Sequence, residues 1–349
     1  MFASRQQLLL SCLAPLLLAH CSRFGFDATH EGGPAAIDAR ADTATDTPFP
    51  DLTPHDSAPP DLMPHDTGPH DLGPSQSLPC TVPTRVNPQG APDELEEVAL
   101  RNDGLTLVVK ENLASTIWYQ TQRSARGQPF GAWTLATFPA TTDQDPTFFL
   151  SSSSDKNAIV TRRPASPGPR RLYLCTSKTS WSCQAIVVRL ATTGLPLTLD
   201  MDGPETVTLP NGTLLMAHNV GPQGGTSADI YLAHPTTPNN LTDWTTAPVP
   251  ALAHPTIKED DPALSPDGLV IVFYAPGPNT DQDLWVSRRP ALSAPFPPPV
   301  LLQDVNSTNA EVEPSFAAIP GKPGHYELFF MSDRAGNTRT EVYRTTCGP

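Results

Sequence analysis

Five carboxylates recur along the 349-residue chain, each at the start of one of five similar segments: Glu97, Asp145, Glu205, Asp261 and Glu313. Crowded carboxylates raise one another's pKa or attract a cation. Two of them at a suitable separation are sufficient to hydrolyse a glycosidic bond. If the fold gathers these side chains, the chemistry they could carry is therefore cation binding or cleavage of a glycan.

Other catalytic patterns are missing from the sequence. It holds no nucleophile elbow, no zinc-protease helix motif, no phosphate-binding glycine loop and no dinucleotide fingerprint. It also lacks a C-x-x-C pair, so zinc and redox roles have no support. We expect no cofactor and no metal site. The histidines of the second half share no spacing, so we expect surface or loop roles for His218, His234, His254 and His325.

The elements that must position the carboxylates repeat at a near-constant period. A hydrophobic residue followed by an aromatic one marks each segment, and the aromatic positions are 55, 58, 54 and 58 residues apart: Trp118, Tyr173, Tyr231, Trp285 and Tyr343. A period in this range is typical of stacked supersecondary units, most often propeller blades. These five aromatic side chains are expected to fill the space between adjacent blades.

The fourth segment has the clearest pattern. Two apolar runs, ending at Leu264 and beginning at Leu269, flank a Ser-Pro-Asp-Gly turn, which predicts a hairpin. A third strand carries Trp285, and 298–302 can supply a fourth. Four short antiparallel strands make one propeller blade, and the innermost strand lines the central channel.

This repeat resembles the WD40-like propeller repeat with a Pro-Asp signature, found in the TolB family of bacterial envelope proteins. The resemblance covers about residues 90–349 and implies an all-β, five-bladed propeller of four-stranded antiparallel blades. It also implies a structural role for the five carboxylates, because the repeat carries an acidic residue at this position as part of its signature. Under that alternative the carboxylates accept backbone hydrogen bonds from the next blade.

Propellers of this kind commonly complete the last blade with the opposite terminus, and the fifth segment here stops after its third strand. The strand-like piece 81–87 is expected to close the ring, which places Cys80 beside Cys347. Cys175 and Cys183 bracket a plausible hairpin turn in blade two. We therefore expect disulfides Cys80–Cys347 and Cys175–Cys183.

The N-terminus is typical of an export signal over residues 1–20. Arg5 precedes an apolar run that ends in Leu-Ala-His-Cys, which resembles the bacterial lipobox with a histidine before the cysteine. Lipidation at Cys21 is expected, with ordinary secretion as the alternative. The even number of remaining cysteines is typical of an exported protein with disulfides.

Residues 21–79 are rich in Asp and Pro and contain a decapeptide repeat that starts at Pro50 and again at Pro60. Such composition cannot bury enough apolar surface to offset its ordering entropy, so a disordered, semi-rigid tether is expected. Its histidines, His55, His65 and His70, could capture a metal, but duplication of a spacer explains the same spacing.

The sequence thus predicts an exported, lipid-anchored propeller, residues 80–349, in the cell envelope. The anchor places it in the outer membrane, facing the periplasm or the cell surface. We expect a monomeric, non-catalytic module that binds an envelope protein or glycan; the alternative is a glycoside hydrolase that uses the channel carboxylates. The net charge of −14 and the lack of basic clusters predict no nucleic-acid partner.

Overall fold

The computed structural model describes residues 77–86, 95–101, 103–111, 117–136, 144–150, 157–163, 169–177, 180–222, 228–238, 240–253, 258–278, 281–335 and 340–349. The expected signal peptide, Cys21 and most of the expected tether lie outside these residues. The chain divides into units 1–67 and 68–349, and every described residue belongs to the second. The regular secondary structure of the described residues consists of β-strands. Among these residues no helix is long and apolar enough to cross a membrane.

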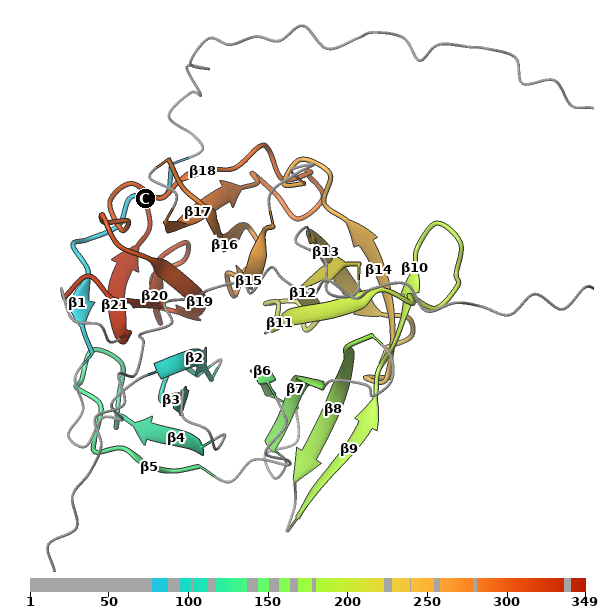
Figure 1. Cartoon of the computed structure of the whole chain (residues 1–349), viewed down its shortest axis with the longest axis horizontal. Helices are drawn as coiled ribbons and strands as arrows, with labels where there is room; N and C mark the ends of the chain where they lie inside the picture. Colours follow the sequence, from blue (N-terminus) through green and yellow to red (C-terminus); the bar gives the residue numbers. More distant parts are fainter. Residues whose placement is uncertain are drawn as a thin grey trace, which may run out of the picture. The chain divides into compact units, whose positions relative to one another are not determined.

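The strands form the five blades of a propeller, as the sequence predicts (Figure 1). Blade one is β2 (Leu95–Leu100), β3 (Thr106–Glu111), β4 (Ile117–Gln122) and β5 (Thr134–Leu135). Blade two is β6 (Gln144–Leu150), β7 (Asn157–Arg163), β8 (Arg171–Ser177) and β9 (Trp181–Ala185). Blade four is β15 (Asp260–Leu264), β16 (Val270–Pro276), β17 (Gln282–Arg288) and β18 (Val300–Leu301). In each the strands follow chain order from the axis outward.

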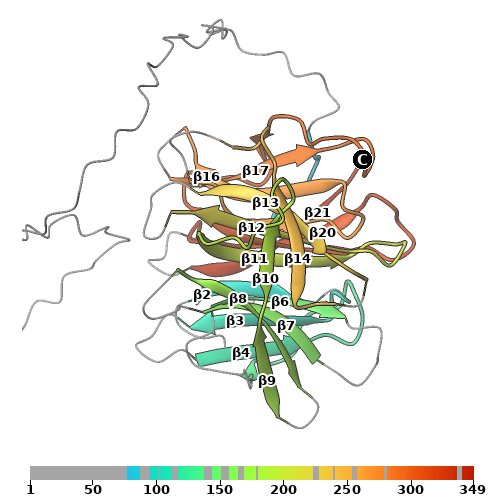
Figure 2. The ribbon, with the colours of Figure 1, turned by 90° about the vertical axis from the view of Figure 1, so that its right-hand side faces the viewer.

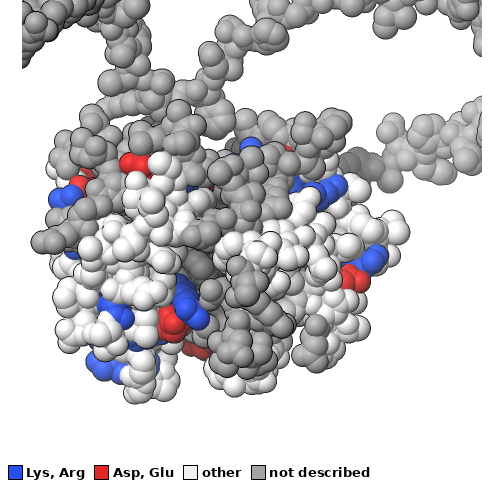
Figure 3. All heavy atoms as spheres, turned by 90° about the horizontal axis from the view of Figure 1, so that it is seen from below, with Lys and Arg blue, Asp and Glu red and all other residues white. Residues whose placement is uncertain are grey.

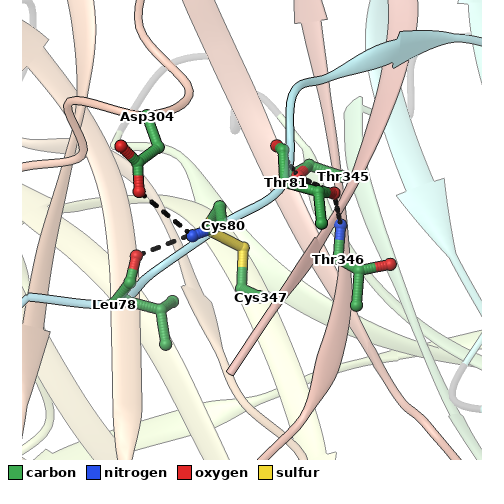
Figure 4. The surroundings of a disulfide bond; sticks show 7 residues. All are labelled: Leu78, Cys80, Thr81, Asp304, Thr345, Thr346 and Cys347. Atoms are coloured by element: carbon green, nitrogen blue, oxygen red, sulfur yellow. Dashed lines mark hydrogen bonds between the residues drawn. A yellow bond between two sulfur atoms is a disulfide. The ribbon is translucent and has the colours of Figure 1, made fainter. Parts of the chain in front are cut away.

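Blade five confirms the expected ring closure. Its strands are β19 (Glu311–Ala318), β20 (Tyr326–Ser332), β21 (Glu341–Cys347) and the N-terminal β1 (Thr84–Arg85), which pairs antiparallel with β21. The disulfide Cys80–Cys347 joins the two ends of the domain (Figure 4). Beside it the Cys80 amide donates to Asp304 Oδ2 at 3.2 Å, and the Thr81 amide donates to the Thr346 carbonyl. The last blade is therefore locked both covalently and by backbone pairing.

Blade three departs from the expected four strands. It holds β11 (Asp200–Thr208), β12 (Leu214–Gly221), β13 (Asp229–Pro235) and β14 (Asp243–Pro248), and β10 (Val187–Leu190) adds a fifth strand parallel to β14 (Figure 2). The segment that leaves blade two thus covers the edge of the next blade, with Ile186 and Val188 buried. Covering an edge removes unpaired backbone groups that invite association. At the end of blade two, the second predicted disulfide, Cys175–Cys183, joins directly opposed residues.

Asp-Gly turns build the first hairpin of blades one and four. In blade four, Gly268 has φ +72°, and the Asp267 carboxylate accepts hydrogen bonds from the Leu269 amide and the Ser265 hydroxyl. The Arg289 guanidinium donates to the Gly268 carbonyl at 2.8 Å. Arg123 makes the same contact with the turn of blade one. An arginine after the third strand therefore clamps the turn between the first two.

Apolar cores lie between neighbouring blades. Four clusters are described, and each joins residues of adjacent blades, such as Val272 and Leu284 of blade four with Phe316 and Leu328 of blade five. Of the five marker aromatics, Trp118 and Tyr343 are buried, and the other three are half-buried. The rigid stack of sheets leaves the inner strands to face the axis, where each contacts the inner strands of both neighbours.

Candidate active site in the central channel

Every inner strand carries a bulge near its start. The register with the second strand slips at one point in β2, β6, β11, β15 and β19. In four blades the inserted residues are a pair that ends in proline: Asp145-Pro146, Gly203-Pro204, Asp261-Pro262 and Glu313-Pro314. Proline has no N–H, so it suits a position that makes no ladder hydrogen bond. The bulges mark one level of the channel.

The bulges hold two acidic residues in a conformation that favours glycine. Gly203 has φ +49°, and the equivalent Asp261 and Glu313 have φ +42° and +54°. Residues other than glycine rarely adopt a positive φ, and the backbone of a residue before proline is further restricted. Strain of this kind costs about 1 to 3 kcal/mol per residue and clusters at functional sites.

The bulge register corrects the sequence alignment of the five carboxylates. Asp145, Asp261 and Glu313 lie inside their bulges, whereas Glu97 and Glu205 follow theirs, at the residue where pairing resumes. The bulge positions of blades three and one are held by Gly203 and Glu96 instead. The bulge of blade one contains one residue, Glu96, and no proline, so the residues after it are displaced by one position relative to the other blades.

Four of the five predicted carboxylates nevertheless meet in one cavity. Glu97, Glu205, Asp261 and Glu313 line it, together with Val98, Gly203, Pro204, Pro262 and Pro314. The cavity measures about 320 Å³ with its solvent-filled opening included. The fifth, Asp145, lies on β6, of which only the backbone is described. Four of the nine lining residues are thus carboxylates that the sequence singled out.

Asp261 has a strongly perturbed carboxyl group. Burial is the main cause that raises the pKa of Asp261 to about 7, and the negative charges of Asp260 and Asp202 add to it. A hydrogen bond with Glu313 and the charge of Lys258 oppose the shift. The residue keeps some exposure at the cavity wall although its carboxyl is enclosed by protein. A proton is therefore held on Asp261 close to neutral pH.

The neighbouring Asp260 is charge-paired instead. Lys258 forms an ion pair with Asp260 Oδ2, and the Tyr274 hydroxyl donates to the same oxygen at 3.1 Å. Burial raises the pKa of Tyr274 well above its usual value, and the charge of Asp261 adds to this effect. Tyr274 therefore remains a hydrogen-bond donor, and the charge of Lys258 is paired with that of Asp260.

Glu97 is ion-paired, in contrast to Asp261. The Lys110 ammonium lies 2.7 Å from Glu97 Oε1 and 2.8 Å from Glu96 Oε2, with the lysine side chain 5% exposed. Burial lowers the pKa of Lys110, but the two carboxylates outweigh it and the net shift is upward. A charged lysine at this distance favours the ionised form of Glu97.

Glu205 is held from the far side of the channel. The Ser315 hydroxyl of blade five donates to Glu205 Oε1 of blade three at 3.3 Å and accepts the Leu100 amide of blade one. Three blades that are distant in sequence thus meet through one hydroxyl. The channel is narrow at this level.

Two buried polar side chains of β12 were missed from sequence. The prediction that His218 is a surface or loop residue is wrong: it is fully buried on β12, and burial lowers its pKa to about 4. Asn219, next to it, is 1% exposed and reaches toward Gly203. Neither residue has a spacing or motif in the sequence that could have marked it. Among the described residues no group of three or more His, Cys, Asp or Glu could hold a metal ion.

Among the described residues of the face in Figure 3, no comparable cluster of charged side chains is seen. On the face seen in Figure 3, basic and acidic side chains are scattered in small groups among uncharged ones. The two disulfides indicate an oxidising, extracytoplasmic compartment. The channel cavity is therefore the candidate site.

Comparison with solved structures gives the fold. No family model and no curated protein matches the chain. The structure is similar to that of a thermostable family-43 glycoside hydrolase, with a TM-score of 0.50 and 11% identity over 75% of this chain and 91% of that one. An endo-arabinase from Bacteroides thetaiotaomicron VPI-5482 (TM-score 0.49, 9% identity, 76% and 96% covered) and a protein of unknown function from Dyadobacter fermentans DSM 18053 (0.47, 9%, 78% and 99%) are also similar. At these identities the likeness extends to the five-bladed propeller and no further.

Proposed function

We propose that the protein is a glycoside hydrolase whose acid–base pair is Asp261 and Glu97. The observation that carries this proposal is the contrast within one cavity between the enclosed Asp261 carboxyl, whose pKa burial raises to about 7, and the Glu97 carboxylate, which is ion-paired with Lys110. Two carboxyl groups whose environments favour opposite protonation states mark a general acid and its ionised partner. The propeller shared with a family-43 glycoside hydrolase supports the assignment at the level of fold.

Each residue has a role in this scheme. Asp261 donates its proton to the glycosidic oxygen as the bond from that oxygen to the anomeric carbon breaks. Ionised Glu97 stabilises the positive charge that develops at the anomeric carbon. Water then adds its hydroxyl to that carbon and gives its other proton to the Asp261 carboxylate, which restores the acid. Lys110 keeps Glu97 charged, and Glu313 hydrogen-bonds to Asp261.

A non-catalytic binding module for an envelope protein or glycan is the second candidate. It is favoured by the recurrence of an acidic residue and proline in the bulges of blades two, four and five, which is expected of a blade signature. In that case the propeller loops recognise the partner and the carboxylates serve the fold.

The cellular setting forms part of the proposal. An export signal over 1–20 and lipidation at Cys21 would tether the propeller in the cell envelope. Replacing Cys21 by alanine is expected to abolish incorporation of labelled palmitate and to release the protein from membranes. An unmodified mature N-terminus in a membrane-bound wild type would contradict the anchor.

The hydrolase is tested with purified full-length protein on a polysaccharide panel that includes arabinan and xylan, with release of reducing ends as the readout. Asp261→Asn and Glu97→Gln are expected to abolish release, whereas Asp243→Asn, on β14 of blade three and away from the cavity, is the matched control and keeps it. Binding to a polysaccharide without release by the wild type would favour the binding module instead.

A further inference from the structure

Asn219 has a buried acceptor that needs a donor. Its side-chain Nδ2 donates to the Glu259 carbonyl, and because a carbonyl can only accept, this contact fixes the orientation of the amide. The other end, Oδ1, is buried and has no hydrogen-bond partner in the described part of the chain. Leaving such an acceptor unsatisfied destabilises the folded state, so its neighbourhood requires an explanation.

Gly203 brings this oxygen close to Asp261. A Cβ atom on Gly203 would lie 2.8 Å from Asn219 Oδ1 and 2.4 Å from Asp261 Oδ1. The two oxygens therefore face the same small space, which exists because blade three has glycine at its bulge. Any larger residue there would displace both side chains.

Two buried acceptor oxygens that face one space repel each other if Asp261 is ionised. A proton on Asp261 removes the repulsion and supplies the missing donor. We infer that Asn219 is a positioning residue, and that its Oδ1 accepts the Asp261 proton and holds it toward the channel. The catalytic consequence rests on the proposed hydrolase; the location of the proton does not.

Several other groups face Asp261. Asp202 lies on β11, Lys258 and Asp260 lie at the start of blade four, Tyr274 lies on β16, and Glu313 lies on β19. None of them is replaced in a variant of Asn219. Variants of Asn219 therefore isolate its own effect on the proton affinity of Asp261.

Two substitutions should move the Asp261 pKa in opposite directions. Asn219→Asp conserves volume and adds a second carboxylate, which disfavours ionisation of Asp261 and raises its pKa. Asn219→Ala removes the acceptor and admits water that can donate to the carboxylate, which lowers it. A hydrogen bond made in one protonation state only corresponds to about tenfold in proton affinity.

The test is a ¹³C NMR titration of full-length protein labelled at aspartate carboxyl carbons, with Asp261 assigned from the spectrum of Asp261→Asn. The expected result is that the Asp261 pKa rises in Asn219→Asp and falls in Asn219→Ala, each change corresponding to about tenfold in proton affinity. Asn306→Ala is the matched control, because Asn306 binds only the Leu284 backbone, and it should cause no shift.

An Asp261 titration that is the same in wild type and both Asn219 variants would overturn the inference. The expected shifts without any polysaccharide cleavage would support it while the hydrolase proposal fails. Loss of the Asp261 proton sets the alkaline limb of the pH–rate profile. Cleavage whose alkaline limb in Asn219→Ala stays where it is in the wild type would overturn the inference and leave the hydrolase in place.

Discussion

The two walls of the channel cavity neutralise their carboxylates by different means. On the blade-one wall, Lys110 compensates Glu97 and Glu96 through short ion pairs. On the wall of blades four and five, Lys258 pairs with Asp260, and Asp261 and Glu313 share a hydrogen bond. One wall therefore keeps a negative charge and the other keeps a proton. The fold is the same in both places, so the difference comes from side chains around the bulges.

The largest effect should follow from removing either member of this pair. Asp261→Asn and Glu97→Gln should each lower kcat/KM by about 10³- to 10⁴-fold on a substrate that the wild type cleaves, the range expected for loss of a general acid or its partner. Initial rates measure this. A loss of less than tenfold in either variant would contradict the assignment of roles.

The ion-paired wall should be the more sensitive to loss of its cation. Lys110→Met leaves Glu97, which is 4% exposed, without its counter-charge, and removing one partner of a buried pair destabilises by about 3 to 5 kcal/mol. Urea denaturation measures the change. Adding Glu97→Gln to Lys110→Met should restore most of the stability, whereas a double variant no more stable than the single one would show that the charge is not the cause.

The protonated wall should reveal itself through pH. The pKa of Asp261 is raised from 3.8 to about 7, so its contribution to stability is complete below pH 3.8 and is lost as pH rises through 7. The free energy of unfolding of Asp261→Asn should therefore rise by about 1 to 2 kcal/mol relative to that of the wild type as the pH increases from 4 to 8, with solvent screening allowed for.

His218 provides an internal check on that comparison. With its pKa lowered to about 4, it contributes stability above pH 6.5 that is lost as pH falls toward 4. This opposite slope is present in both proteins and cancels in their difference. A difference between wild type and Asp261→Asn that is flat across this range would contradict a proton on Asp261.

The smallest effect concerns Glu205. Ser315→Ala removes the hydroxyl that donates a hydrogen bond to Glu205 across the channel. The loss should lower the free energy of unfolding by about 1 kcal/mol and change kcat/KM by less than tenfold. Thermal denaturation and initial rates measure the two quantities. A loss as large as that of Asp261→Asn would place Glu205 in the acid–base pair instead.

Much of this architecture could be predicted from the sequence, because its signals are local or periodic. The Asp-Gly turns and the aromatic period predicted five blades, and the unfinished fifth segment predicted both β1 on β21 and the Cys80–Cys347 bridge. The fifth strand of blade three carried no such signal, since β10 pairs with a strand more than 50 residues away along the chain.

The site was predicted only in part. Its carboxylates were found by alignment, but the alignment treated bulge and post-bulge positions as one. Bulge register depends on which backbone groups pair, which sequence spacing does not report. Gly203 and Asn219 matter because the space beside Gly203 is bordered by oxygens of Asn219 and of Asp261 in the next blade. Lys110 matters because strand pairing brings it opposite Glu97.

The most direct test of the central claim is a carboxyl titration of the wild-type protein labelled with ¹³C at both aspartate and glutamate side chains. Asp261 should titrate with a midpoint near pH 7, while Glu97 remains ionised from pH 5 to 8. Asp261 titrating near the ordinary value of a free carboxyl group, about 4, or Glu97 taking up a proton between pH 5 and 8, would contradict the division of the cavity into a protonated and an ionised wall.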